Sequence, residues 1–211
     1  MKKIIVILVL FGLAKQWAAA QESAEKVSFT TGELRVGYGA TRFGAGLKEA
    51  YEAGGFGPTG GGLYSLALFH KFTRIPYVQF GLKFKALGAG PSTGDNGNEL
   101  FFNYWNNGIA VKYYPLDRAT RRGLVVYADY FFVGQFTQKY RNTARQEFNH
   151  QFAIGSAFNG GIGYEFPLKR RNTAITIGLE YESASRQGEV SGVGDRQFRN
   201  TNIGFMAGLR F

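Results

Sequence analysis

Two histidines, His70 and His150, are the side chains of this sequence best suited to acid–base chemistry. Acyl transfer needs a nucleophile, a base and a group that orients the base, all within hydrogen-bond reach. His70 lies an odd number of residues from Ser65, so the two would face opposite sides of a strand. His150 lies near Ser156 in a polar, loop-like segment. We therefore predict no catalytic residues and no enzyme.

A possible metal-binding segment runs from Asp95 to Glu99, with the sequence Asp-Asn-Gly-Asn-Glu. It superficially resembles a calcium loop, but it lacks the full alternation of oxygen ligands that ends in a glutamate at the twelfth position. It is more typical of a turn-rich loop tip. The sequence has no cysteine, which removes thiol catalysis and cysteine-based metal sites. We predict no metal site and no cofactor.

A third group of polar residues consists of charged side chains that recur opposite apolar ones in strand-like segments. Its members are Arg35, Lys83, Lys85, Lys112, Asp129, Glu165, Glu180, Glu182 and Arg210. Inside a closed sheet, an uncompensated buried charge costs several kcal/mol. These residues are therefore predicted to form an ion-pair network that fills a lumen. The same residues in a second arrangement could form a gated polar path for protons or small ions.

The elements that must position these charges are strands, because the dominant period from Glu33 onward is two. Eight segments show it: Glu33–Phe43, Leu63–Phe72, Tyr77–Leu87, Leu100–Tyr114, Leu124–Val133, Phe152–Phe166, Ala174–Ser183 and Thr201–Phe211. Each is about ten residues long, which is the length that a tilted strand needs to cross a bilayer. The sequence predicts an all-β fold, an eight-stranded antiparallel up-and-down transmembrane β-barrel.

The connections between these segments alternate in length. Residues 73–76, 115–122 and 167–172 form short connections, whereas residues 44–62, 88–99, 134–151 and 184–200 form long ones rich in Gly, Ser, Asn and charge. Short turns at one end and long loops at the other are typical of bacterial outer-membrane barrels, with the short turns on the periplasmic side. An even number of strands also places both termini on the periplasmic side.

The first twenty residues read as a signal peptide. Lys2 and Lys3 precede an apolar run from Ile4 to Ala14, which is too short to span a bilayer as a helix. Ala18 and Ala20 then give a small-x-small cleavage pattern. We predict export and cleavage near Ala20, so that residues 21–211 form the barrel domain, with strands over about 33–211.

These features together resemble the small eight-stranded outer-membrane β-barrel family, which includes the transmembrane domain of outer membrane protein A. The resemblance covers nearly the whole chain after residue 20 and is architectural. Its one local motif is the C-terminal assembly signal, which Phe211 matches at its last position. Leu209 replaces the preceding aromatic residue, and Met206 stands where the motif has glycine. The resemblance implies a location in the bacterial outer membrane and insertion by the barrel assembly machinery.

Two turn sequences, Tyr113-Tyr114-Pro115-Leu116 and Glu165-Phe166-Pro167-Leu168, are similar to those of barrels from the Bacteroidota.

The main alternative to a membrane barrel is a soluble exported barrel, such as a lipocalin-like binder, with its charged face outside. That outer face would carry many glycines, and the loop asymmetry would have no purpose. Aromatic residues at strand ends instead suit a membrane-interface belt. They are Phe72, Tyr77, Tyr113, Phe166 and Phe211.

The long connections bear on the function. The long loops carry Lys48, Lys139, Arg141, Arg145, Arg186, Arg196 and Arg199, interleaved with Tyr51, Phe56, Phe136, Tyr140, Phe148 and Phe198. Such a rim is either simply solvated or a contact surface for lipopolysaccharide phosphates, another cell or an envelope protein. The leading hypothesis is a structural or interaction protein. A narrow, porin-like channel or transporter for small solutes is the second hypothesis, and a lipid-modifying enzyme is the third. The third lacks the His-x-Ser pair of the lipid A deacylase barrels.

The net charge of +10 bears on the partners. The positive residues are scattered through strands and turns, and no basic helix or RNA-binding signature accompanies them. We therefore predict no nucleic-acid partner. Outer-membrane lipid and lipopolysaccharide, whose headgroups are anionic, fit the basic surface better.

Overall fold

The computed structural model describes residues 30–44, 47–72, 75, 77–116, 123–144, 146–168, 173–190 and 194–211. Most of them lie in antiparallel strands. In chain order the elements are β1 (Thr30–Phe43), α2 (Lys48–Ala53), β2 (Thr59–Lys71), β3 (Val78–Ala89), β4 (Ser92–Thr93), β5 (Glu99–Tyr113), β6 (Gly123–Arg141), β7 (Glu147–Pro167), β8 (Ala174–Val190) and β9 (Gly194–Arg210). The predicted signal peptide lies outside the described residues.

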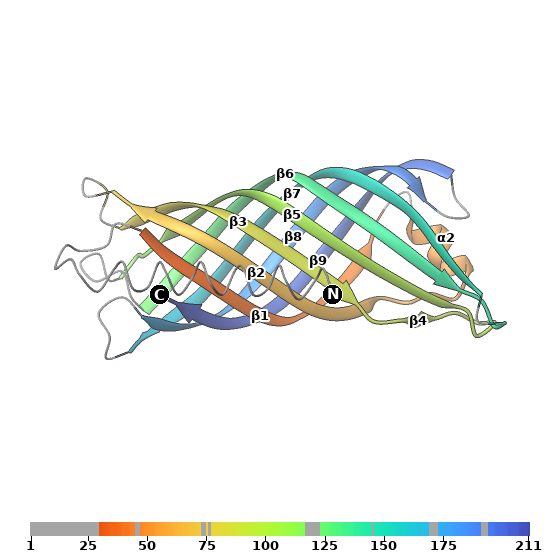
Figure 1. Ribbon diagram of the computed structural model, residues 1–211, viewed down its shortest axis with the longest axis horizontal. Coiled ribbons are helices and arrows are strands. Elements are labelled where there is room, and N and C mark those ends of the chain that lie inside the picture. The colour runs from red at the N-terminus through yellow and green to blue at the C-terminus, as the bar shows by residue number, and fades with distance from the viewer. Residues whose placement is uncertain are drawn as a thin grey trace, which may run out of the picture.

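The strands close into a barrel (Figure 1). Each long strand pairs with the next one along the chain, and β1 pairs with β9 to close the ring. The two-residue strand β4 only extends the edge of β5, so β3 pairs directly with β5 and eight long strands form the wall. The predicted eight-stranded antiparallel barrel is confirmed. Among the described residues, no helix has the length and apolar character needed to cross a membrane.

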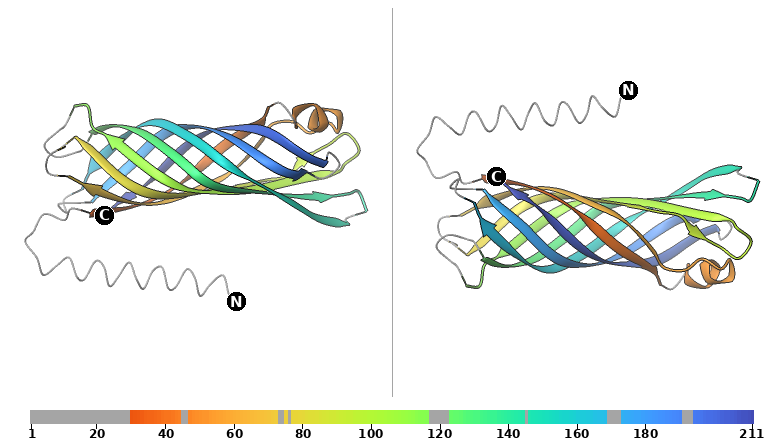
Figure 2. Two further views of the ribbon diagram at one scale, coloured as in Figure 1. Left: turned by 90° about the horizontal axis from the view of Figure 1, so that it is seen from above. Right: turned by 90° about the horizontal axis from the view of Figure 1, so that it is seen from below.

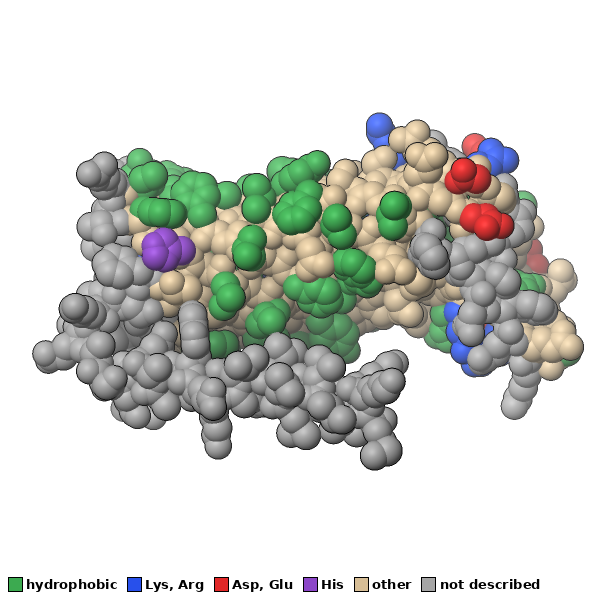
Figure 3. All heavy atoms as spheres, turned by 45° about the horizontal axis from the view of Figure 1, so that its top comes forward, with side chains coloured by type: hydrophobic (Ala, Val, Ile, Leu, Met, Phe, Trp, Pro, Cys, Tyr) green, Lys and Arg blue, Asp and Glu red, His purple; other side chains and the backbone are tan. Residues whose placement is uncertain are grey.

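The apolar face of each strand points outward. On β1, Val36 and Tyr38 are 51% and 64% exposed, whereas Arg35, which precedes Val36 and points to the opposite face of the strand, is completely buried. Figure 3 shows hydrophobic side chains covering much of the barrel wall. A soluble barrel would bury its apolar face and expose its charges, so this orientation is that of a barrel whose wall faces lipid.

The two ends of the barrel differ. The terminal end holds Thr30 and Phe211, and there the backbone N–H of Gly32 donates to the carbonyl of Phe211 (2.7 Å). The opposite end, here called the distal end, carries α2 (Figures 1 and 2). The five strand-end aromatics predicted as an interface belt are all exposed. They belong to the terminal end or the turns near it.

The barrel continues past its apolar band at the distal end. Toward the distal end, the exposed side chains of β9 change from Ile203 to Arg199, and those of β8 change from Tyr181 to Gln187. Acidic and basic side chains gather at this end in Figure 3. Strands β6 and β7 have 19 and 21 residues, about twice the 9–11 that a tilted strand needs to cross a bilayer. The strands thus continue past the apolar band, and the exposed side chains beyond it are polar.

Two of the predicted long loops were wrong, because the strands extend through most of them. Residues 134–151 and 184–200 were expected to be loops, but β6 runs to Arg141, β7 begins at Glu147, and β8 and β9 fill most of the second range. The reason is that Phe136 and Phe198 point inward and are buried, which gives these polar-walled segments a core of their own. The other two predicted loops contain α2 and β4.

Candidate functional site

The lumen of the barrel is filled by charged side chains. Eleven of those in the described residues are buried: Glu33, Arg35, Lys83, Lys85, Lys112, Asp129, Glu165, Glu180, Glu182, Arg186 and Arg210. The structure therefore brings together all nine residues singled out from the sequence. It adds Glu33, at the start of β1, and Arg186, from a range expected to be loop. Because buried charges need partners, the pairing decides whether this interior is stable.

The central group of the lumen is built around Glu180. One oxygen of this carboxylate accepts hydrogen bonds from Arg35 Nη2 at 2.5 Å and from Lys83 Nζ at 3.2 Å. The other oxygen lies 3.1 Å from Lys85 Nζ. Lys83 also donates to Asp129 at 2.7 Å. Strands β3 and β8 lie on opposite sides of the ring, so the pairs of Lys83 and Lys85 with Glu180 span the lumen.

A second group lies nearer the terminal end. Lys112 on β5 pairs with Glu33 on β1 and with Glu165 on β7, the latter at 3.0 Å. Arg210 on β9 pairs with the same Glu165, whose carboxylate also accepts a hydrogen bond from the hydroxyl of Tyr114 at 3.1 Å. Four strands are thus cross-linked at this level. Glu33 was missed at the sequence level because it stands at the edge of the predicted first strand.

A third polar layer faces the distal end. Glu182 lies 3.1 Å from Lys85 Nζ and accepts a hydrogen bond from Asn106 Nδ2. Arg186 donates to Asn106 at 2.9 Å and to Asn200 at 3.1 Å. The expectation that Arg186 belongs to an exposed rim was wrong, because its position on β8 turns it inward, where it is 1% exposed.

Aromatic side chains close the barrel at its distal end, beyond this polar layer. We call Phe43, Tyr51, Phe102, Phe136 and Phe198 the aromatic plug. Their ring centroids lie 4.7 to 5.9 Å apart in successive contacts. The hydroxyl of Tyr51 donates to Gln138 at 3.2 Å, and burial raises the pKa of this hydroxyl above its ordinary value. Tyr51, Phe136 and Phe198 were expected on an exposed contact surface. That expectation was wrong, because all three are buried.

The two histidines do not assemble a catalytic group in the part of the chain described. His70 lies at the terminal end, where its Nδ1 is 3.2 Å from the hydroxyl of Thr30, and Ser65 is buried in the wall. The side chain of His150 lies outside the described residues. Gly97, in the calcium-like segment, has a φ of +71°, as a tight turn needs. Over the described ranges no cluster of three or more metal-ligating side chains occurs.

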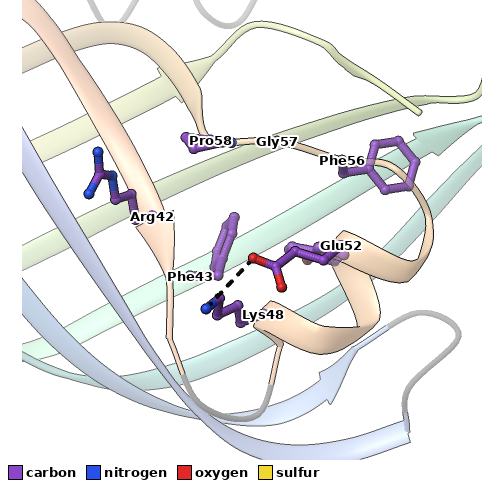
Figure 4. Close-up of a pocket in the computed structure, with 8 residues that line it drawn as sticks. Arg42, Phe43, Lys48, Glu52, Phe56, Gly57 and Pro58 are labelled. Carbon is purple, nitrogen blue, oxygen red and sulfur yellow. Dashed lines mark ion pairs between the residues drawn. The ribbon is translucent and has the colours of Figure 1, made fainter. Parts of the chain in front are cut away.

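The distal end has a hollow, here called the distal pocket. It has a volume of about 410 Å³ and lies between the end of β1 and helix α2. Arg42, Phe43, Lys48, Glu52 and Phe56 contribute to its walls (Figure 4). Its one ion pair, Lys48 with Glu52 at 3.8 Å, is well exposed. Of the other cations predicted for the rim, Arg141 pairs with Glu99 at 2.9 Å.

Solved structures share this architecture. Ail, the attachment invasion locus protein of Yersinia pestis, solved in complex with the heparin analogue sucrose octasulfate, superposes with a TM-score of 0.51 at 13% identity, covering 87% of this chain and 100% of its own. The chain has the fold of the small eight-stranded outer-membrane β-barrels. A second structure of Ail gives the same TM-score and coverage at 14% identity. Neisserial surface protein A has a TM-score of 0.49 at 13% identity, over 88% of this chain and 98% of its own.

No protein-family model matches the sequence, and no curated protein sequence matches it significantly. At such low identities the shared property is the fold. Like the outer-membrane barrels whose fold it shares, this barrel turns its apolar side chains outward and keeps its charges inside. Small outer-membrane barrels have varied roles, so the role of this one must be argued from its own side chains.

Proposed function

We propose that this outer-membrane barrel is a non-enzymatic interaction protein that acts through its distal end. The observation that carries the proposal is the extension of the strands past the apolar band, with a polar outer wall and the aromatic plug inside. In barrels of this kind the short turns and the termini face the periplasm, so the distal end faces the outside of the cell. A folded, protruding end is suited to contact another molecule or cell.

The filled lumen argues for this role over conduction. Ion pairs cross the lumen at three levels, and the aromatic plug closes it at the distal end. An eight-stranded barrel has an interior just wide enough to be filled by side chains. A solute path would require the crossing pairs to separate, and each buried charge left unpaired would cost several kcal/mol. The narrow-channel alternative therefore requires a large rearrangement.

Several partners belong to the same proposal. The signal peptide would direct export and be cleaved near Ala20, and Phe211 would present the C-terminal signal to the barrel assembly machinery. Outer-membrane lipid and lipopolysaccharide would then surround the wall. Ail was solved with the heparin analogue sucrose octasulfate, and by analogy heparin is a first probe for an external partner of this barrel.

Two measurements test the proposal. The first is conductance of the refolded chain 21–211 in planar bilayers, where we expect no stable current steps. The second compares heparin binding by the wild type with binding by a trimmed variant. In that variant, residues 139–149 are replaced by Asn-Gly, because Gln138 and His150 face each other in the sheet and a two-residue turn can join them.

The trimmed variant should lose binding and still shift on a gel when boiled, which shows that the barrel folds. As a control, the second protruding hairpin is trimmed instead by replacing residues 190–194 with Asn-Gly, because Glu189 and Asp195 are also paired. Regular current steps from the wild type would replace the proposal with a channel. A change in the mass of lipid A in cells that express the protein would replace it with an enzyme.

A further inference from the structure

Asn107 is a polar side chain on the outer face of the apolar band. On the outer face of β5 it stands between Ile109 and Trp105. Its partners on the neighbouring strands are Phe84 of β3 and Val133 of β6. Tryptophan favours the level at which hydrocarbon meets the headgroups. Because Asn107 lies two residues closer to the terminal end than Trp105, its amide is placed within the hydrocarbon, among apolar neighbours.

The amide of Asn107 lacks a polar partner at this level. The preceding residue, Asn106, points into the lumen, where it donates to Glu182 and accepts from Arg186. Within the described part of the chain, by contrast, the side chain of Asn107 makes no hydrogen bond. Hydrocarbon can neither donate nor accept one, and polar side chains at this depth are costly and often functional. A contact that offers a polar group to this amide is therefore favoured.

A β-bulge beside Asn107 adds an extra side chain to the outer wall. Asn107 pairs with Val133 of β6. The next residue of β5, Gly108, pairs with Phe131, so Phe132 is the extra residue of the bulge. As a result Phe132 and Val133 both face outward, and they are 56% and 47% exposed. Bulges re-aim side chains in this way, and here the bulge directs the ring of Phe132 out of the wall on the β6 side of Asn107.

A hollow in the outer wall, here called the wall hollow, lies on the other side of Asn107. It has a volume of about 290 Å³, and Asn107 and Phe132 stand at its border. Most of its lining consists of exposed apolar side chains of β2 and β3, namely Leu66, Leu68, Leu82 and Phe84. Strand β5 lies between β3 and β6 in the sheet. The wall therefore has a protruding ring on one side of the amide and a hollow on the other.

This surface is complementary to itself. Barrels whose short turns all face the periplasm share one orientation, so two copies in contact are related by a two-fold axis along the membrane normal. An axis that passes in front of Asn107 brings the two amides together. Each amide has donors and an acceptor, so the pair can exchange two hydrogen bonds. The same rotation exchanges the β3 side with the β6 side, so Phe132 of each copy meets the wall hollow of the other.

We propose that two copies of this chain associate in the membrane through the Asn107 face, which consists of Asn107, Phe132 and the wall hollow. A lipid chain can fill the hollow, but it offers only hydrocarbon to the amide, whereas a second copy offers an amide and a ring of matching position. The proposal goes beyond the interaction role and does not depend on it, because the contact lies on the wall and not at the distal end.

The experiment uses a single introduced cysteine, because the chain has none of its own. Ile109→Cys places the thiol next to Asn107 on β5 and keeps the amide. The chain 21–211 carrying it is refolded, diluted in phospholipid vesicles and treated with a short bifunctional thiol reagent. Ile203→Cys is the matched control, since Ile203 is 60% exposed on β9, which lies opposite β5 in the ring. We expect a cross-linked dimer from Ile109→Cys and monomer from Ile203→Cys.

Further variants in the Ile109→Cys chain test the two parts of the contact. Asn107→Leu should raise the dissociation constant of the dimer roughly tenfold, as expected for the loss of two hydrogen bonds between membrane-spanning segments. Asn107→Gln keeps an amide and should dimerise nearly as well as the parent. Phe132→Ala should also weaken the dimer, whereas Phe205→Ala, which removes a ring of similar exposure from β9, should not. Each variant must show the gel shift of a folded barrel.

Equal cross-linking through Ile109→Cys and Ile203→Cys would overturn the proposal, because random collisions would then explain both. A monomer that retains a lipid in native mass spectra, without cross-linking, would assign the wall hollow to lipid instead. An unchanged dissociation constant in Asn107→Leu would show that the amide does not hold the pair. Conductance and heparin binding do not enter these measurements, so the interaction role and the dimer can fail separately.

Discussion

Replacing Glu180 with glutamine removes a negative charge that three buried cations share. Its carboxylate lies 2.5 Å from Arg35 Nη2, 3.2 Å from Lys83 Nζ and 3.1 Å from Lys85 Nζ. All four side chains are 0–1% exposed. Glutamine keeps the shape and one oxygen, so the substitution changes charge with little change in packing. It leaves the described lumen with six buried cations and four carboxylates in place of five.

The expected loss follows from what each cation retains. Removing one partner of a buried ion pair costs about 3–5 kcal/mol when the other charge is left alone. Here each cation keeps one carboxylate partner: Glu33 for Arg35, Asp129 for Lys83 and Glu182 for Lys85. We therefore expect Glu180→Gln to lower the free energy of unfolding by about 3 kcal/mol, at the low end of that range.

The assay is urea unfolding of the chain 21–211 in detergent micelles, followed by fluorescence. Trp105 is the sole tryptophan of that range, and its position on the wall of β5 reports on the barrel. Glu189→Gln is the matched control, since Glu189 is on the same strand but exposed, and should change stability by less than about 0.5 kcal/mol. If Glu180→Gln unfolds at the same midpoint as this control, the buried network does not stabilise the barrel as argued.

A double-mutant cycle tests whether the energy lies in the pairing. Combining Glu180→Gln with Lys85→Met should destabilise by less than the sum of the two single changes, with a coupling of about 0.5–3 kcal/mol, because the second change removes a cation that the first left under-compensated. Additive losses would mean that the two side chains contribute independently, and the proposed sharing of charge would be wrong.

Phe136→Ala should destabilise the distal end by about 3–5 kcal/mol, because it opens a cavity in the aromatic plug. The variant should still not conduct in planar bilayers, since the ion pairs of the lumen remain. Current steps would show that the plug alone closes the lumen. Gly108→Val should reduce the refolded fraction, because a Cβ at this position would collide with the carbonyl oxygen of Tyr130. Gly57→Val is the control and should refold normally, because the space around its Cβ is open. Equal refolding yields would contradict the predicted collision. The wild type should run differently on a gel with and without boiling, and an unchanged mobility together with solubility in plain buffer would refute the membrane barrel.

Much of the wall could be predicted because the strand signal is local. Apolar and polar residues alternate along each segment, so the predicted Leu100–Tyr114 differs from β5 (Glu99–Tyr113) by one residue at each end. The same alternation sorted the charges onto one face. Which face is inside was argued from the glycines and the loop asymmetry, since period two alone is the same for both orientations.

The distal extension was harder to predict because it lies beyond the lipid. Within the apolar band the two faces of a strand differ strongly, whereas beyond it the outer face is polar and the inner face mixed. The signal that remained was Phe136 between Gln135 and Thr137, an apolar residue flanked by polar ones past the end of the predicted strand. Phe198, between Gln197 and Arg199, repeats it.

The sequence by itself determined the number of membrane-crossing strands, their two faces and the residues that would need charge partners. Only the tertiary structure decided which partners meet. Lys83 joins Asp129, 46 residues away, and Glu180, 97 residues away. These contacts depend on how the ring closes and on the register of every strand between them. A local pattern can require that a buried charge be compensated, but it cannot specify which distant carboxylate a closed barrel will bring to it.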